Sequence, residues 1–556
     1  MSDAKTQVRE YHRLTKHSFK GYAPSPGFLD WDSQPDPFRR YIGAPEVELP
    51  LVTSESTVSY ADLYETDIEP QALNKRSLGL YLELAFGLSA WKTTGMESWS
   101  LRHNPSSGNL HPTEVYVLLW GRVDDTLPPG LYHYAPHSHA LEQRALLQPA
   151  AADEMSALHP SSMGALCFSS VHWREEWKYG ARALRYCQHD VGHALASARY
   201  AAGILGWRLR MSTLLGDDQL ASVMGLDRDW GDAEPETPDV AAILGTGAVH
   251  ELAAEIDWTY LAEQLVEWRG EPNQLSAEHA YWPHISRVLP ALKKPAAGDV
   301  LLAPPDAPSA RLSLNCVAPN AERIIRQRRS AQRMMLGEGT TLTDFVRLLT
   351  LCMPGAQRAP FDIFPYAPAV NLLVFVHQVA ELPPGLYMLA RSDDLLADLK
   401  VSCQADGLLW QPVEQVPGLP LYVLVDGQDM RKTASQLSCY QGIAGHSAFS
   451  LGMLAPLDTV MDAEGAWAYR RLFWEAGILG QLLYLEAGAA NLSGTGIGCY
   501  FDDHVHDLLG LAHEGNWQSL YHFTVGKARE DQRLTTLSGY HHLTREREPF
   551  HEPVTS

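Results

Sequence analysis

The hexapeptide Leu-Pro-Pro-Gly-Leu-Tyr occurs at residues 127–132 and again at residues 382–387. The two copies begin 255 positions apart, which is the size of a whole domain rather than of a short solenoid repeat. A six-residue match within 556 residues rarely arises by chance. The repeat therefore predicts that the chain contains two fused copies of one fold unit.

The sequence around each hexapeptide shows the same order of apolar patterns. In the first half, the patterns predict a helix over 78–88, a strand over 115–120 and a helix over 191–205. In the second half, they predict a helix over 342–351, a strand over 370–376, a helix over 478–492 and a strand over 520–525. We expect each half to be an α+β unit in which helices pack on a small sheet.

Prolines become frequent between residues 271 and 308, and the apolar periodicity fades there. Such a stretch is typical of a connector between folded units. We therefore expect one domain over residues 1–270, a proline-rich connector over 271–310 and a second domain over 311–556.

The composition indicates an acidic soluble protein. There are 44 Lys and Arg residues against 66 Asp and Glu residues, so the formal net charge is −22. This balance argues against a nucleic-acid partner and against an acidic membrane surface. The start of the chain has no apolar signal core, and the longest apolar runs have the length of strands. We expect a cytoplasmic protein with no membrane partner.

The cysteines and histidines point to no metal site. The seven cysteines are widely spaced and form no CxxC pair, so we expect reduced, mostly buried thiols. The paired histidines at 137 and 139, 504 and 506, and 541 and 542 lack carboxylate or cysteine partners at the spacing usual for zinc.

A polar loop precedes the first hexapeptide. It reads Arg102-His-Asn-Pro-Ser-Ser-Gly-Asn-Leu-His-Pro-Thr-Glu-Val-Tyr116 and runs into the predicted strand. Two hydroxyls, an amide and backbone N–H groups in a fixed turn suit hydrogen bonding to a polar planar cofactor. The alternative interpretation is an ordinary capped turn before a strand.

This loop, followed by the hexapeptide, resembles the signature of nitroreductase-type flavoproteins, and among them of the SagB/ThcOx-type dehydrogenases, which oxidise azoline rings in ribosomally made peptides. Further stretches at residues 11–17, 25–31, 177–182 and 190–193 extend the resemblance in the same order along the chain. The resemblance implies an α+β fold with two fused nitroreductase-like, FMN-binding sandwich domains that form an intramolecular pseudo-dimer. FMN would lie at the interface between them.

The two halves differ where this family binds FMN. A gap-free match of the hexapeptides sets Pro105 against Pro360, so Phe361-Asp-Ile-Phe364 replaces the serines, glycine and asparagine of the first loop. The stretch Arg328-Arg-Ser-Ala-Gln332 resembles the family's phosphate-binding arm, with Gln332 in place of an arginine. We expect the glycines at 494, 496 and 498 to form a tight backbone turn near the cofactor.

The resemblance implies that each site takes its loop from one copy and its arm from the other. The surviving pieces then form one composite site. Its predicted cofactor-binding residues are Arg102, Pro105, Ser106, Ser107, Asn109, Arg328, Arg329, Ser330, Gln332, Gly496, Lys527 and Arg529. The opposite site would combine Arg13, Thr15 and His17 with the loop at Pro360, and we expect it to be empty.

Lys178 and Tyr179 are the predicted catalytic residues. Dehydrogenation beside a ring nitrogen requires a base for the α-proton, and a lysine or tyrosine can serve as that base. Counting from Asp190 against Glu475, the second half has Ala463 and Glu464 at these positions. The alternative interpretation is a surface lysine beside an anchoring tyrosine.

Together these patterns predict an FMN-dependent oxidoreductase that resembles the thiazoline and oxazoline oxidases of peptide natural-product pathways. One alternative is a general NAD(P)H-dependent nitroreductase or quinone-type reductase, and another is a non-catalytic scaffold with the same fold. The expected partners are a small molecule or a modified peptide as substrate, and NAD(P)H or O2 as redox partner. An internal pseudo-dimer would allow the chain to function as a monomer.

Overall fold

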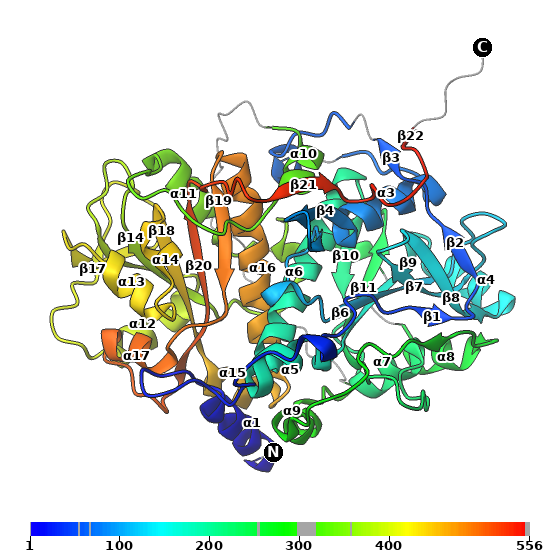
Figure 1. Ribbon diagram of the computed structural model, residues 1–556, viewed down its shortest axis with the longest axis horizontal. Coiled ribbons are helices and arrows are strands. Elements are labelled where there is room, and N and C mark those ends of the chain that lie inside the picture. Colours follow the sequence, from blue (N-terminus) through cyan, green and yellow to red (C-terminus); the bar gives the residue numbers. More distant parts are fainter. Residues whose placement is uncertain are drawn as a thin grey trace.

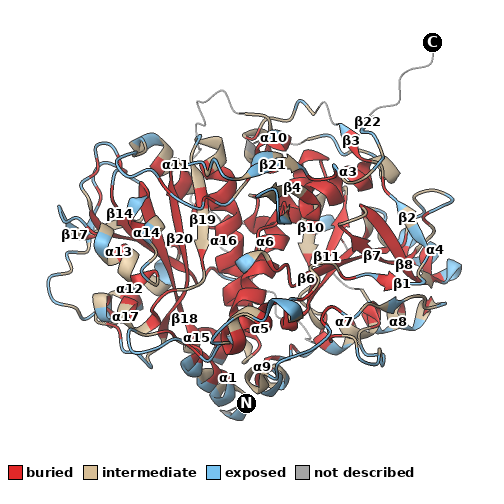
Figure 2. Cartoon of the chain, in the orientation of Figure 1, coloured by how far each residue is buried: buried red, intermediate tan, exposed pale blue. Residues whose placement is uncertain are grey.

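The computed structural model describes residues 2–53, 56–65, 68–252, 256–296, 319–355 and 358–550. Two long helices, α6 (Ala183–Ile204) and α16 (Ala468–Ala489), cross at the centre, with one sheet on each side (Figure 1). Both helices are buried along almost their whole length (Figure 2). They form the interface between the two halves of the chain.

The two sheets have the same strand order. The first runs β10 (Arg208–Met211), β11 (Thr237–Gly245), β9 (Ser162–Ser170), β6 (Thr113–Leu119), β7 (Gly130–Ala135), β8 (Ala140–Leu147) and β12 (Leu265–Val266), and β2 (Glu46–Glu48) also pairs with β8. The second runs β19 (Ser493–Ile497), β20 (Trp517–Gly526), β18 (Phe449–Pro456), β14 (Asn371–Val376), β15 (Gly385–Leu389), β17 (Leu421–Asp426) and β16 (Gln411–Pro412). This matching order confirms that the fold unit is duplicated.

Each hexapeptide leads into a central strand, β7 or β15. In the first copy the Tyr132 hydroxyl donates to the Pro128 carbonyl over 2.6 Å, and in the second the Tyr387 hydroxyl donates to the Pro383 carbonyl over 2.8 Å. A Cβ on Gly130 would lie 2.4 Å from a carbonyl oxygen of the neighbouring strand. The repeated residues therefore close the same turn and allow the same close strand approach in both halves.

The helices are duplicated as well. Helix α5 (His172–Tyr179) corresponds to α15 (Leu457–Glu464), and like α6 and α16 these helices begin and end 285 positions apart. Helices α3 (Lys75–Phe86) and α11 (Leu342–Cys352) occupy the positions predicted from apolar spacing. The predicted strands correspond to β6, β14 and β20.

Shorter helices cover the outer faces of both sheets. On the first sheet these are α4 (Pro149–Leu158), α7 (Asp217–Met224) and α8 (Trp258–Gln264), and on the second they are α12 (Asp393–Ser402), α13 (Arg431–Leu437), α14 (Gly442–His446) and α17 (Asp502–Leu509). Other helical segments are α2 (Asp62–Glu65), α10 (Ala321–Gln327), η1 (Trp31–Ser33), η2 (Ser107–Asn109), η3 (Gly180–Arg182), η4 (Val249–Glu251) and η6 (Phe361–Ile363). Within the described part of the chain, no helix has both the length and the apolar character needed to span a bilayer.

Segments from each end of the chain cross to the other half. Helix α1 (Ser2–Leu14) packs on the second half, where Lys5 bonds Asp462 over 2.6 Å. The C-terminal segment passes over the first half (Figure 1). There β21 (Thr535–Ser538) pairs with β4 (Leu88–Thr93), which also pairs with β5 (Ser98–Arg102), and β22 (Glu548–Pro549) pairs with β3 (Val52–Thr53). Each half is therefore completed by residues of the other.

The proline-rich stretch is partly folded. Its strand β13 (Glu271–Pro272) pairs with β1 (Tyr41–Ile42), while α9 (Pro283–Val288) and η5 (Leu289–Leu292) bury Ile285, Val288 and Leu292. Residues 297–310 of the predicted connector lie outside the described residues. The division at residues 270 and 310 stays a prediction.

The prediction of reduced thiols is wrong for two cysteines. Cys439 and Cys499 form a disulfide with their Cα atoms 5.8 Å apart. They are separated by 60 residues, so their spacing alone does not indicate that the fold brings them together. The cysteines at 167, 187, 352 and 403 are free and buried, and Cys316 lies outside the described residues.

Candidate functional site

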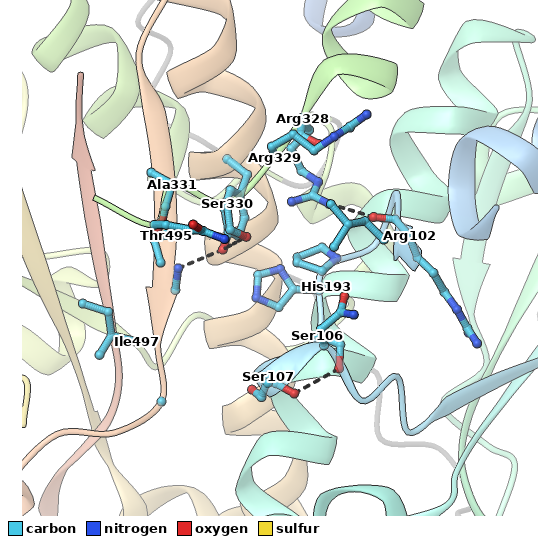
Figure 3. Close-up of a pocket in the computed structure, with 18 of the residues that line it drawn as sticks. Arg102, Ser106, Ser107, His193, Arg328, Arg329, Ser330, Ala331, Thr495 and Ile497 are labelled. Carbon is cyan, nitrogen blue, oxygen red and sulfur yellow. Dashed lines mark hydrogen bonds between the residues drawn. The ribbon is translucent and has the colours of Figure 1, made fainter. Parts of the chain in front are cut away.

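A cavity of about 480 Å³ opens between the two halves. Its first-half wall comes from β5, residues 105–109 and α6, and its second-half wall comes from residues 328–332, β19 and residues 528–534. Figure 3 shows Ser106 and Ser107 across the cavity from Arg328 and Arg329, with His193 between them. The structure thus brings the polar loop of one half to the arginine-rich segment of the other.

The polar loop is held in a fixed shape by its own hydrogen bonds. The Asn109 amide donates to the Ser100 carbonyl over 2.8 Å, and the His111 N–H donates to Ser106 Oγ over 2.8 Å. Gly108 has φ of +61° and Asn109 has φ of +62°, a conformation that glycine and asparagine tolerate best. The loop is therefore a capped turn, and its serines still line the cavity.

The arginines of the second half brace this loop. Arg328 donates from Nε to the His103 carbonyl over 3.0 Å and from Nη2 to the Arg102 carbonyl over 2.7 Å. Arg329 donates to the Ser89 carbonyl over 2.8 Å. Both arginines also line the cavity, so they join the halves as well as supplying positive charge to it.

Other predicted second-half residues have different surroundings. The Ser330 hydroxyl lies 2.9 Å from the Tyr484 hydroxyl, and Gln332 and Arg529 line the cavity with exposed side chains. Lys527 does not line it: its ammonium group donates to the Asn491 carbonyl over 3.2 Å at the exposed surface. Of the predicted cations, Arg529 has the most exposed position in the cavity wall.

The predicted turn at Gly496 is wrong. Residues 493–497 form strand β19 at the edge of the second sheet. A Cβ on Gly496 would lie 1.9 Å from the Tyr521 hydroxyl, and one on Gly498 would lie 2.2 Å from the Tyr186 ring. The glycines let aromatic rings pack against the strand beside the cavity, which is a different reason for glycine than a tight turn.

The predicted catalytic residues lie against the tip of the loop. A Cβ on Gly108 would be 2.6 Å from the Tyr179 hydroxyl and 3.1 Å from Lys178 Nζ. Tyr179 lines the cavity, whereas Lys178 lies just behind the loop. Both residues are at the end of α5, where Gly180 interrupts the helix with φ of +54°.

Burial shifts the proton affinities of two cavity groups. Arg102 is 4 % exposed, and this burial lowers its pKa to about 10. Asp190 on α6 is 2 % exposed, and its burial raises its pKa above its usual range in spite of the hydrogen bond from the Ser107 N–H. Its carboxyl group can therefore hold a proton at a pH where an exposed aspartate is ionised.

Several cavity residues escaped the sequence analysis. Asp190 and His193 line the cavity and lie in the stretch 190–193. The resemblance of that stretch to the flavoprotein family was the available signal. Tyr186, Tyr484 and Tyr521 also line the cavity. They lie inside regular helices and a strand, where nothing in the local sequence separates a cavity aromatic from a core aromatic.

The equivalent loop of the second half is filled by its own side chains. Phe361, Ile363 and Phe364 are buried in the main hydrophobic core, and Asp362 accepts hydrogen bonds from Arg199 Nε and Nη2. A small cavity near Tyr366, lined also by Trp474 and Asp217, measures about 10 Å³. That space is about the size of one water molecule.

The first-half residues predicted for this opposite site serve the fold. Arg13 is exposed on α1, while Thr15 Oγ1 donates to the Tyr11 carbonyl over 2.8 Å and accepts from Arg185 over 3.0 Å. His17 Nδ1 accepts from the Ala23 N–H over 2.8 Å. These contacts account for the two buried side chains without a ligand.

Comparison with known proteins agrees with this architecture. Residues 413–527 match the model of the Nitroreductase family. No curated protein matches the chain. A crystal structure described as a nitroreductase from Anabaena variabilis is similar over 94 % of this chain and 99 % of its own, with 22 % identity and a TM-score of 0.68. The chain therefore has the nitroreductase fold in two fused copies that form an intramolecular pseudo-dimer.

Two further structures resemble smaller parts of the chain. The E. coli microcin synthetase complex matches 44 % of this chain and 93 % of its own, with 18 % identity and a TM-score of 0.26. A nitroreductase in complex with FMN from Exiguobacterium sibiricum matches 37 % of this chain and 88 % of its own, with 12 % identity and a TM-score of 0.22.

Proposed function

We propose that the chain is an FMN-dependent oxidoreductase with one composite flavin site. One observation carries the proposal: the polar loop of the first half and the arginine segment of the second half line a single cavity of about 480 Å³. The equivalent loop of the second half is packed with buried side chains of its own. The duplicated fold would then bind one flavin between its halves.

The groups in the cavity fit FMN chemically. Arg529, Arg328 and Ser330 combine guanidinium groups with a hydroxyl, which suits a phosphate. On the other side, the serine hydroxyls and the Asn109 amide belong to a loop that suits the polar edge of a flavin ring. The buried atom His111 Nδ1 has no hydrogen-bond partner among the described residues, which a bound polar group would supply.

For the reaction, we propose dehydrogenation of an azoline ring in a small molecule or a modified peptide. Bound FMN would supply the hydride acceptor, and the protein would supply position and proton transfer. Tyr179 lines the cavity, and Lys178 lies behind Gly108. Burial raises the pKa of Tyr179 well above its usual range, so its neutral hydroxyl would hold the substrate by a hydrogen bond. Lys178 would receive the substrate proton after a movement of the loop tip. NAD(P)H or O2 would act as the redox partner.

Flavin content tests the proposal directly. Purified protein should be yellow and should release FMN on denaturation, whereas colourless protein that does not bind added FMN would overturn the proposal. The double variant Arg529→Ala, Ser330→Ala should lose flavin because both groups line the cavity without bracing the loop backbone. Arg13→Ala, on the exposed face of α1, is the matched control and should keep it. Equal loss from both variants would contradict a single composite site.

A further inference from the structure

Two carboxyl groups are buried together beneath the polar loop. Glu175 on α5 is 0 % exposed and Asp190 on α6 is 2 % exposed. Neither Glu175 oxygen has a hydrogen-bond partner among the described residues, and neither does Asp190 Oδ2. Asp190 Oδ1 accepts from the Ser107 N–H over 3.2 Å. Two unpaired carboxylates in such a place would be very unfavourable, so the pair must keep a proton.

The second copy shows that the fold does not require a carboxyl group at the position of Glu175. Helices α5 and α15 have the same bounds 285 positions apart, and the counterpart of Glu175 is the buried apolar Val460. Asp190 corresponds to Glu475, which accepts hydrogen bonds from the Ala369 N–H over 3.0 Å and from Arg391. Among the described residues, no arginine pairs with Asp190. Compared with the second half, the half with the cavity therefore has one more buried carboxyl group, at Glu175, and lacks the cation that would balance Asp190.

The pair is also connected to the cavity. Asp190 lines the cavity directly, and Ser107 joins it to the loop. Burial and the neighbouring Asp190 charge raise the pKa of Glu175 well above its usual range. The charged and titratable groups that act on the pair are Lys178 and Tyr179 from α5, Tyr186 and Cys187 from α6, and Tyr521 from β20. The only cation among them is Lys178.

We propose that Glu175 and Asp190 form a proton-storing pair that exchanges protons with the group bound in the cavity. In its resting state the pair holds one proton and one negative charge. When a bound group gives up a proton, Asp190 accepts it, both carboxyl groups become neutral, and the donor loses one unit of positive charge. The reverse step returns the proton, and no electrons move within the pair. The identity of the group that exchanges protons with the pair rests on the proposed flavin site. The storage of a proton by the pair does not depend on that site.

The first test needs no flavin. A raised carboxyl pKa stabilises the fold below its unfolded value and loses that contribution as pH rises through the folded value. The wild-type thermal midpoint should therefore fall as pH rises above about 4, the pKa of an exposed carboxyl group. The variant Glu175→Val copies the second half, so it should fold and should show a shallower fall. The same slope in wild type and variant would overturn proton storage.

The second test measures the protonation of the carboxyl groups in the protein with FMN bound. Infrared difference spectra on photochemical flavin reduction should contain a carboxyl C=O band that disappears in Glu175→Gln and in Asp190→Asn. Glu176→Gln is the matched control: burial also raises the pKa of Glu176 to about 7, but neither Glu175 nor Asp190 acts on Glu176. The carboxyl C=O band should remain in Glu176→Gln. An unchanged band in all three variants would overturn the exchange, whereas a failure to bind flavin would count against the flavin site and leave the first test decisive.

Discussion

Gly192 of α6 and Gly477 of α16 face each other where the two long helices cross. A Cβ on Gly192 would lie 2.9 Å from the Gly477 Cα and 2.2 Å from the Trp474 carbonyl oxygen, and a Cβ on Gly477 would lie 2.9 Å from the Gly192 Cα. The two glycines are 285 positions apart, like the helices that carry them. The pseudo-two-fold axis therefore passes close to this contact, and the fit of the halves depends on it.

Gly192→Ala should destabilise the protein by about 2–3 kcal/mol because the added methyl group would force the backbones of α6 and α16 apart. Thermal unfolding measures the effect. Gly488→Ala on α16 is the control, since its Cβ would meet Ile324 at an ordinary 3.7 Å. That substitution should be neutral or stabilising by up to about 1 kcal/mol, as is usual for glycine to alanine within a helix. Equal effects of the two changes would contradict the packing account.

Glu83 on α3 pairs with two arginines, one on α10 and one in the C-terminal segment. It is 0 % exposed and bonds Arg326 over 2.7 Å and Arg547 over 2.5 Å. Glu83→Gln should lower the free energy of unfolding by about 2–3 kcal/mol at neutral pH, less than for a fully buried pair because both arginines are partly exposed. Asp125→Asn, in an exposed pair with Arg122, should change it by less than about 0.5 kcal/mol.

The effect of Glu83→Gln should also depend on pH. Burial alone would raise the pKa of Glu83, but Arg326 and Arg547 hold it well below its usual value of 4.5. A lowered carboxyl pKa contributes stability above the unfolded value, and this contribution is lost as pH falls toward the folded value. The difference between wild type and variant should therefore shrink in acid, as urea denaturation at neutral and acidic pH can show. A constant difference would contradict the ion pair as its cause.

The fold was easier to predict than the site because local sequence patterns, repeated in both halves, determine it. The hexapeptide and the apolar periodicity of α6 and α16 are visible in single segments. The site depends on contacts between segments, and its chemistry changes with burial. The sequence predicted Arg328 as a phosphate ligand, and the structure shows that it also donates hydrogen bonds to two carbonyls of the polar loop. Glu175 stands in a polar stretch that resembles an exposed helix face, and only packing shows that it is buried.

The Cys439–Cys499 disulfide should be measurable in the purified protein. Thiol titration under denaturing conditions should find two more thiols after reduction than before it. The bond closes a loop of 60 residues, so Cys439→Ser with Cys499→Ser should cost about 2–4 kcal/mol. Cys439 and Tyr440 have φ of +52° and +58°, so loosening should begin in that turn. Equal thiol counts would show that the bond is absent in solution.

Lys178→Ala should separate azoline oxidation from general nitroreduction. The variant should keep its flavin, because Lys178 does not line the cavity. Oxidation of a thiazoline-containing peptide needs a base for the substrate proton, so Lys178→Ala should slow it by about 10²- to 10⁴-fold. Reduction of a nitroaromatic by NADPH needs no such base and should be unchanged. Steady NADPH consumption that ignores Lys178→Ala, with no azoline oxidation by the wild type, would instead identify a general reductase that uses the same composite site.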